Sequence, residues 1–419
     1  MTEVELVIKN AAQLLTLSPS FKEGSGLGMI RNGAVVVKDG RIFWVGKTEE
    51  ISEKFFLNRE GREIDATGKV VMPGLIDPHT HLVFAGSREN EFEQRIRGLS
   101  YLEIAERGGG ILSTVEATRK ASFDELFSLG EKRLDRMLSK GVTTLEAKSG
   151  YGLSLEGEIK ILKVMKALQD SHPIDIIPTF LGAHTVPKEF KTHRTHYIDL
   201  IAEEMIPMVA QERLAEFCDV FCEEKAFTLE ESRKILEIGK RYGLKPKIHA
   251  DQLSPGGGAE LAAEVGAFSA DHLEYVSQEG IKKMTEKGVT AVLLPGASFF
   301  LSMKKYPPAR EMIEQGVAVS LATDLNPGSS MTESLPLILT MGCTMFKMTP
   351  KEVIEAATVH AARSMGRERE IGSLESGKQA DLLLLDIPNY RHLPYHFGVD
   401  HADLVIKKGK VVFTKSLSH

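Results

Sequence analysis

The sequence predicts an α/β protein in which a (β/α)8 barrel carries a small β-sandwich domain built from both ends of the chain. The middle of the chain alternates short apolar runs with amphipathic helical stretches, as the strands and helices of such a barrel do. Both ends consist instead of short β-rich runs separated by turns. Polar side chains suited to chemistry follow the barrel strands where those strands end, which is where barrels of this kind carry their active sites.

Both ends of the chain contain short runs of β-forming residues separated by turn residues. The first 69 residues contain "ELVIKN" and "GAVVVKDGRIFWVG", and the Asp39-Gly40 pair between β-rich runs predicts a hairpin. Residues 366–419 return to this style in "ADLLLLD" and "ADLVIKKGKVVFT". We therefore expect residues 1–69 and 366–419 to form one composite domain, and residues 70–365 to form the barrel.

The barrel strands are predicted from apolar runs that alternate with helical stretches. These runs cover residues 71–79, 142–148, 174–183, 218–223, 246–250, 268–273, 290–294 and 318–323. The stretch "FDELFSLGEKRLDRMLSKG" is typical of the helices between them, with apolar residues three or four apart and a closing glycine. A doubly wound open sheet is less consistent with the sequence, because no glycine-rich dinucleotide-binding turn follows the first strand.

Composition excludes several classes of partner. The formal net charge of −6 provides no basic field for nucleic acid or for an anionic membrane surface. No run of uncharged apolar residues is long enough for a membrane span, and the first residues lack the pattern of a signal peptide. Three cysteines are too few for a disulfide framework. We expect a cytoplasmic protein that binds no nucleic acid and no membrane.

Histidines and one aspartate at the predicted strand ends indicate a metal centre. His79 and His81 are two residues apart, so in a strand their side chains share one face. His249, His272 and Asp324 follow the fifth, sixth and eighth strands. Imidazoles with one carboxylate suit Zn²⁺ or Fe²⁺ and leave room for a water molecule. We predict one divalent ion per subunit held by His79, His81, His249 and Asp324, with His272 close by but not coordinating.

A centre with two metal ions needs a bridging anionic ligand. The fourth strand offers Glu223 or Glu224, but no lysine at its end that carboxylation would turn into a bridge. Lys148 lies on the second strand, and we interpret it as a structural residue or as one that supports the metal ligands. The prediction is therefore a single ion.

Several long motifs resemble a known enzyme family. "IDATGKVVMPGLIDPHTH" and "GSLESGKQADLLLLD" are similar to the amidohydrolase superfamily, and "HTHLVFAGSRENEFEQRIRGLSYLEIAERGGG" and "KIHADQLSPGGGAELAAEVGAFSADHLEY" resemble its imidazolonepropionase family. The resemblance implies hydrolysis of 4-imidazolone-5-propanoate to N-formimidoyl-L-glutamate in histidine degradation, and it implies a homodimer. The alternative is another cyclic amide hydrolase or a deaminase of the superfamily that acts on a carboxylate-bearing ring.

The resemblance also implies roles for individual residues. The four predicted metal ligands match those of the family, and Asp324 and His272 are the expected catalytic residues. Asp324 would carry a proton to the ring nitrogen, and His272 would steady the water or the developing oxyanion. The expected substrate-binding residues are Arg88, Tyr151, His184, Gln252, Asn326, Gly328 and Ser329. Tyr101 is a weaker candidate for the same pocket.

The residue types agree with such a substrate, although each has a simpler interpretation. Arg88 offers a planar fork for the propanoate carboxylate, or it forms an ion pair with Glu89 or Glu91. The run from Asn326 to Ser329 offers hydrogen-bond donors, or it is only a turn. Gln252 carries no exchangeable carboxyl proton, which argues against a deaminase that shuttles protons at this position.

Overall fold

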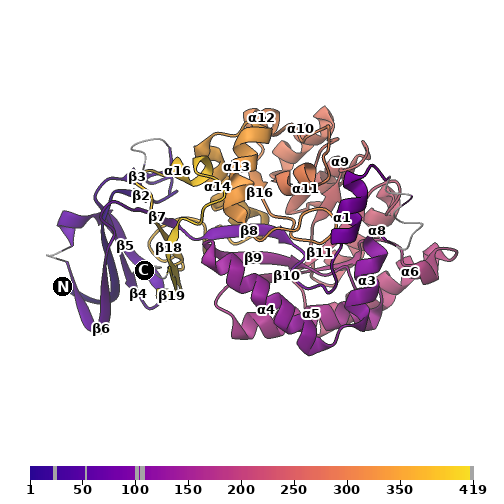
Figure 1. The fold of residues 1–419 in the computed structure, drawn as a ribbon, viewed down its shortest axis with the longest axis horizontal. Coiled ribbons are helices and arrows are strands. Elements are labelled where there is room, and N and C mark those ends of the chain that lie inside the picture. The colour runs from indigo at the N-terminus through magenta and orange to yellow at the C-terminus, as the bar shows by residue number, and fades with distance from the viewer. Residues whose placement is uncertain (22–25, 52–53, 100–102, 104–108, 416–419) are drawn as a thin grey trace.

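The computed structural model describes residues 1–21, 26–51, 54–99, 103 and 109–415. Figure 1 shows two parts, a group of β-sheets on the left and a larger unit on the right in which helices surround the strands. The predicted fold class, an α/β barrel with a small β domain from both chain ends, is confirmed.

The first sheet of the small domain has the strand order β5-β4-β1-β6. Its strands are β1 (Thr2–Ala11), β4 (Gly33–Lys38), β5 (Arg41–Lys47) and β6 (Phe55–Asp65). Strands β4 and β5 form the predicted hairpin, because Asp39 and Gly40 adopt the positive φ values, 52° and 69°, that its two-residue turn requires.

The second sheet combines strands from both ends of the chain in the order β19-β18-β17-β7-β2-β3. These strands are β2 (Gln13–Leu15), β3 (Met29–Ile30), β7 (Val70–Pro73), β17 (Leu382–Leu385), β18 (Ala402–Lys407) and β19 (Lys410–Thr414). Leu6 and Val35 of the first sheet share one buried cluster with Val71 and Leu384 of the second, so the two sheets pack as a sandwich. The domain boundaries at residues 69 and 365 stay a prediction.

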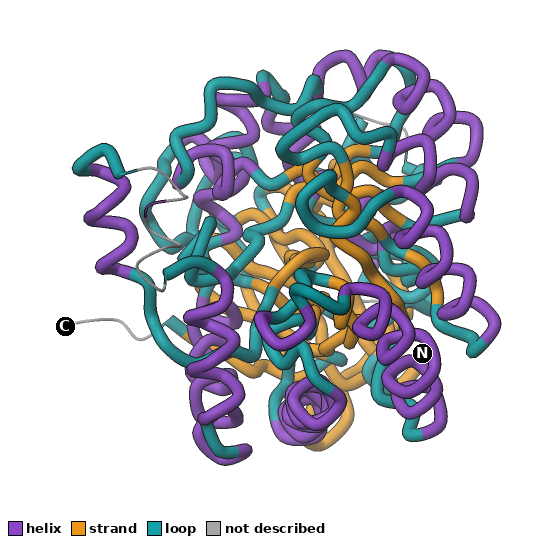
Figure 2. The backbone as a smooth tube through the Cα atoms, turned by 90° about the vertical axis from the view of Figure 1, so that its right-hand side faces the viewer, coloured by secondary structure: helices purple, strands orange, loops and turns teal. Residues whose placement is uncertain are grey.

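Eight parallel strands form the barrel in chain order, and the short strand β12 extends the pairing of β11. They are β8 (Leu75–Thr80), β9 (Val142–Lys148), β10 (Asp175–Ala183), β11 (Phe217–Cys222), β12 (Lys245–Pro246) with β13 (Ile248–Ala250), β14 (Ser269–His272), β15 (Thr290–Leu293) and β16 (Val319–Leu321). The segment after β16 returns to β8, where the Asp324 amide donates to the His79 carbonyl at 3.0 Å. The barrel is therefore nearly closed, and Figure 2 shows its strands inside a ring of helices.

The first predicted strand differs from the structure. Residues 71–79 are not one strand but parts of two, β7 of the sandwich and β8 of the barrel, separated at Gly74. A Cβ at Gly74 would lie 2.3 Å from Thr143 Oγ1, so only glycine permits the chain to pass this close to β9. The change from one sheet to the other could not be predicted from the sequence, because the apolar run continues through it.

Helices follow the barrel strands and cover the barrel. Several of them are α3 (Ile111–Lys120), α4 (Phe123–Ser139), α5 (Leu155–Ser171), α8 (Leu229–Arg241), α9 (Gly258–Val265), α10 (Gln278–Lys287) and α13 (Leu335–Phe346). The others, of four to eight residues, are α1 (Glu89–Ile96), α6 (Arg194–Leu200), α7 (Ile206–Gln211), α11 (Pro295–Phe300), α12 (Ala309–Glu314), α14 (Pro350–Ala356), α15 (Val359–Ser364) and α16 (His392–Tyr395). A five-residue π-helical segment, Ile201–Met205, joins α6 to α7. Ser122 and Thr228 begin α4 and α8 with capping boxes.

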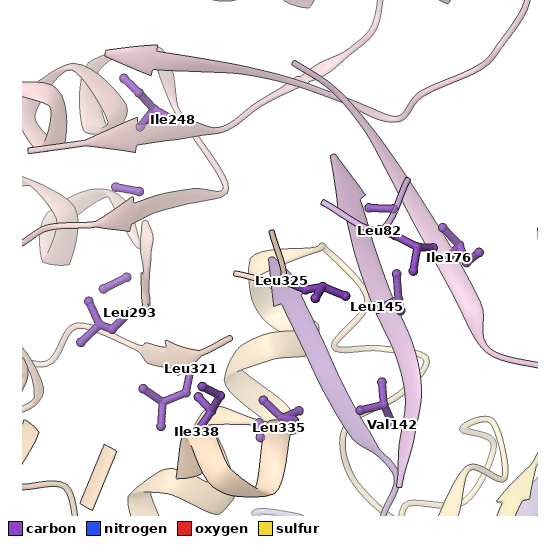
Figure 3. Close-up of a cluster of buried hydrophobic side chains, with 14 of the residues drawn as sticks. Leu82, Val142, Leu145, Ile176, Ile248, Leu293, Leu321, Leu325, Leu335 and Ile338 are labelled. Atoms are coloured by element: carbon purple, nitrogen blue, oxygen red, sulfur yellow. The ribbon is translucent and has the colours of Figure 1, made fainter. Parts of the chain in front are cut away.

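Branched apolar side chains pack between the barrel strands and the helices that surround them. Leu145, Ile176, Ile248, Leu293 and Leu321 come from five different strands and belong to one buried cluster (Figure 3). This packing fixes the strands, so side chains at the strand ends are held in place. Within the described part of the chain, no helix is long and apolar enough to cross a membrane.

Candidate metal centre and substrate pocket

Five polar side chains that the sequence analysis singled out lie at the carboxyl ends of the barrel strands. His79, His249 and His272 belong to β8, β13 and β14, while His81 and Asp324 follow β8 and β16. Each of the five is at most 3% exposed. The side chains of distant sequence positions are thus enclosed together at the mouth of the barrel.

The nitrogen and oxygen atoms of these side chains converge. Within the described ranges, donor atoms of His79, His81 and Asp324 lie within 4.8 Å of one another, and so do those of His79, His249 and His272. Asp324 Oδ1 is 3.5 Å from His79 Nε2 and 3.7 Å from His81 Nε2. His79 belongs to both groups and links them. His272 lies among the donors, so its predicted role as a neighbour that does not coordinate stays a prediction.

The donor set fits a divalent cation. Among the described residues, His79 Nε2, His81 Nδ1, His272 Nδ1 and both ring nitrogens of His249 are buried without a hydrogen-bond partner. Such atoms are costly unless something else satisfies them, and neutral imidazole nitrogens are good metal ligands. Burial lowers the pKa of His79, His81 and His272 well below the ordinary value, which keeps these rings unprotonated.

Asp324 is held by the loop that follows it. Its backbone has a φ of 50°, in the left-handed region, and its carbonyl accepts a hydrogen bond from Asn326 Nδ2 at 2.7 Å. Ser329 Oγ donates to Asp324 Oδ2 at 3.3 Å. Burial raises the pKa of Asp324 to about 7, and a neighbouring cation would favour the ionised carboxylate.

A buried ionic network lies against the histidines. Lys148 Nζ is 2.7 Å from Asp219 Oδ2, 2.9 Å from Glu146 Oε1 and 3.3 Å from Asp271 Oδ2, and Lys247 Nζ is 2.7 Å from Glu146 Oε2. All of these side chains are fully buried. Burial alone would lower the pKa of Lys148, but Asp219 and Glu146 raise it above its ordinary value, so the ammonium is charged.

Two carboxylates of this network touch two of the histidines. Asp271 Oδ2 is 2.7 Å from His79 Nδ1, and Asp219 Oδ2 is 3.1 Å from His249 Nδ1, although the latter pair is not aligned for a hydrogen bond. A carboxylate at one ring nitrogen keeps the proton there and turns the other nitrogen toward a metal. Neither aspartate was predicted from the sequence. Their signal is a single carboxylate inside an otherwise apolar strand, as in "FCDVFC".

Arg88 lies at the start of α1, in the loop after β8. Its Nε and Nη2 donate to Glu91 Oε2 at 2.9 and 2.7 Å, so the simpler interpretation, an ion pair with Glu91, is present. The pair is not a surface pair, however, because the Arg88 side chain is 12% exposed. A Cβ at Gly328 would lie 2.2 Å from Arg88 Nη1. The structure thus brings Arg88 and Gly328 together, with Nη1 outside the ion pair.

Tyr151 and His184 form an aromatic wall beside His81. The His81 and His184 rings stack with centroids 5.1 Å apart, and the Tyr151 ring is 5.4 Å from each. His184 Nδ1 lies 3.0 Å from the Gly150 carbonyl, and burial lowers the pKa of His184 to about 3. This ring is therefore neutral, with its proton on Nδ1.

The remaining predicted pocket residues lie in two loops. Asn326 Oδ1 accepts from the Gly328 and Ser329 amides at 2.8 Å, and Asn326 Nδ2 donates to Ser329 Oγ at 2.7 Å, so this run is a well-ordered turn. Gln252 is buried in the loop after β13. Glu223 orders that loop by accepting from the Leu253 amide and Ser254 Oγ, both at 2.7 Å. Tyr101 lies outside the described residues.

Fold and site together define a barrel hydrolase of the metal-dependent class. The model of the amidohydrolase family matches residues 70–412. Curated proteins named imidazolonepropionase are similar over nearly their whole length: one from Geobacillus sp. (strain WCH70) is 55% identical over 97% of both chains, and one from Alkaliphilus oremlandii is 52% identical over 98% of this chain and 99% of its own. The chain therefore belongs to the amidohydrolase family and, within it, to the imidazolonepropionases.

Solved structures share the fold at much lower sequence identity. An adenosine deaminase from Xanthomonas campestris, solved with bound zinc, superposes with a TM-score of 0.73 at 16% identity, covering 98% of this chain and 93% of its own. At this identity the likeness shows the fold alone. It places the composite β domain and the barrel in one architecture that covers almost the entire chain.

Proposed function

We propose that the barrel mouth hydrolyses the ring amide of 4-imidazolone-5-propanoate to N-formimidoyl-L-glutamate, with one Zn²⁺ or Fe²⁺ ion held by His79, His81, His249 and Asp324. The observation that carries this assignment of residues is the grouping of buried donor atoms around His79, with His81 and Asp324 in one group and His249 and His272 in the other, together with the unpartnered ring nitrogens among them. The names of the curated relatives support the same reaction.

The reaction adds water to the ring carbonyl carbon and breaks the bond from that carbon to nitrogen. A divalent ion bound at this site would acidify a water molecule and polarise the carbonyl. Asp324 takes a proton from the attacking water and returns it to the leaving ring nitrogen. His272 donates a hydrogen bond to the carbonyl oxygen as negative charge develops on it. The aspartates against His79 and His249 hold these rings in place during the cycle.

The substrate carboxylate and ring need separate binding groups. Arg88 binds the propanoate through Nη1, which the ion pair with Glu91 leaves outside its two hydrogen bonds. Tyr151 and His184 form one wall of the ring pocket. Gln252, Asn326, Gly328 and Ser329 complete the pocket from the loops after β13 and β16.

The direct test follows the ultraviolet absorbance of 4-imidazolone-5-propanoate after addition of purified protein. Chelated protein, protein restored with Zn²⁺ or Fe²⁺, and a blank without protein run in parallel. We expect loss of the band and formation of formimidoylglutamate only with metal-loaded protein. Turnover that persists after complete chelation would contradict the proposed role of the histidines and Asp324.

Two further features of the protein stay predictions. The family resemblance predicts a homodimer, which sedimentation velocity at several protein concentrations tests. The composition predicts a cytoplasmic location, which fractionation of cells tests.

A further inference from the structure

The described residues contain a third group of possible metal ligands beside the proposed centre. Donor atoms of Asp219, His249 and Asp271 lie within 4.8 Å of one another, and all three side chains are buried. Two carboxylates that share an imidazole with a metal centre are a suitable arrangement for a second divalent ion.

A lysine side chain already enters this group. Lys148 Nζ lies 2.7 Å from Asp219 Oδ2 and 3.3 Å from Asp271 Oδ2, and all three side chains have no exposed surface. An ammonium group and a second cation at this position would repel each other in a medium of low polarity. The ammonium group of Lys148 therefore occupies the position between Asp219 and Asp271.

The surroundings hold the ammonium where it is. Glu146 Oε1 is 2.9 Å from Lys148 Nζ and also accepts from Thr179 Oγ1 at 2.5 Å, while Glu146 Oε2 is 2.7 Å from Lys247 Nζ. Three carboxylates thus face two ammonium groups, and the remaining negative charge lies toward His79 and His249. Every charge in this interior network has an opposite neighbour.

We propose that the ammonium of Lys148 takes the place of a second metal ion and keeps Asp219 and Asp271 in contact with His249 and His79. Lys148 is in this sense a positioning residue, which acts on the metal ligands through the two aspartates. The inference rests on the proposed function, because it concerns how many ions the proposed centre accepts. It also gives a physical reason for the predicted single ion, in addition to the lack of a lysine that could form a bridge at the end of the fourth strand.

The first experiment measures the metal content of the wild-type chain. The protein is equilibrated with excess Mn²⁺ or Zn²⁺, freed of unbound ion and analysed for ions per chain. We expect one ion. Two ions per wild-type chain would overturn the inference and leave the metal centre intact, whereas no bound ion would overturn the proposed function itself.

The second experiment removes the ammonium. We expect Lys148→Met to bind two ions per chain and, with Mn²⁺, to give the electron paramagnetic resonance spectrum of two coupled ions, which in two-metal sites lie roughly 3.5–4 Å apart. Lys247→Met is the matched control, since it removes a second fully buried lysine of the same network that contacts Glu146 rather than the two aspartates. This control should retain one ion. A folded Lys148→Met protein with one ion would overturn the inference.

Folding provides a further readout, because loss of Lys148 leaves buried carboxylates without compensation. We expect Lys148→Met and Lys148→Gln to refold with Mn²⁺ but poorly with chelator, and Lys247→Met to show no such difference. Equal refolding of the Lys148 variants under both conditions contradicts the inference. Failure under both conditions also contradicts it, because a second ion then does not replace the ammonium.

Discussion

Gly328 illustrates how a single residue shapes the candidate pocket. A Cβ added at Gly328 would lie only 2.2 Å from Nη1 of the Arg88 guanidinium. Because that group is the far end of a flexible side chain, it can move aside at small cost in stability. The absence of a side chain at Gly328 therefore determines where the proposed carboxylate anchor points.

We predict that Gly328→Ala leaves the melting temperature nearly unchanged and raises KM, with a loss in kcat/KM of about tenfold, no larger than the loss on removing Arg88. Steady-state kinetics and thermal melts test this. In an Arg88→Ala background the same substitution should have no further effect, since the group that it displaces is gone. Additive effects of the two substitutions would show that Gly328 acts independently of Arg88.

Arg88 itself is predicted to bind the substrate carboxylate. Arg88→Ala should lower kcat/KM about tenfold or more, mainly through KM, because a hydrogen bond to a charged group contributes about 1.5–3 kcal/mol. Arg97→Ala serves as the control, since Arg97 lies just after the same helix in an exposed pair with Glu93. Equal kinetics for Arg88→Ala and wild type would favour a substrate without a carboxylate.

At the scale of elements, the loop between β9 and α5 is ordered by one buried side chain. Glu158, in the first turn of α5, accepts from the Gly150 amide at 3.0 Å and from the Gly152 and Leu153 amides at 2.8 Å. Tyr151 lies within this loop, so the start of a helix determines the position of a proposed binding residue. Glu158 also lies in the first turn of α5, where the partial positive charge of the helix N-terminus stabilises a carboxylate.

We predict that Glu158→Gln destabilises the fold by about 1–3 kcal/mol, because its amide nitrogen would face a backbone amide that now has no acceptor. KM should rise as the Tyr151 ring loses its fixed position. Urea unfolding and steady-state kinetics are the measurements. Glu156→Gln, at an exposed site of the same turn, should change neither quantity. If both variants behave alike, the loop does not depend on Glu158.

Barrel elements were largely predictable because each is a local pattern. The predicted strand 142–148 coincides with β9, and the helix predicted from residue 123 begins at Phe123, after its Ser122 cap. The first strand was predicted wrongly, since residues 71–79 change from one sheet to another at Gly74. Periodicity identifies a buried run, but it does not say which sheet buries it.

At the scale of the whole molecule, a partly buried charge cluster joins the small domain to the barrel. Lys407 of β18 lies 2.8 Å from Asp175 Oδ2 at the start of β10 and 2.7 Å from Asp381 Oδ2. Lys408 adds a contact of 2.8 Å to Asp175 Oδ1. Burial alone would raise the pKa of Asp175, but the two lysines and Gln379 lower it to about 2.

Because the pKa of Asp175 is lowered, the stability of the contact between the small domain and the barrel depends on pH. The ionised carboxylate of Asp175 contributes stability above its ordinary pKa of 3.8, and the contribution is lost as the pH falls toward 2. We predict that Asp175→Asn costs about 2 kcal/mol at neutral pH and flattens the acid limb of the stability curve between about pH 4 and 2. Urea unfolding at a series of pH values measures this. Asp170→Asn, at an exposed site, should reproduce the wild-type acid limb.

The sequence by itself determined the fold class and the kinds of side chain at the strand ends. Both follow from local order, since periodicity marks the strands and the residue after each strand must lie at the barrel mouth. Only the tertiary structure decided that Asp219 and Asp271 contact His249 and His79, and that Lys148 lies between the two aspartates. Those contacts join different strands of the barrel. Their distances depend on strand register and barrel closure, which no single stretch of sequence contains.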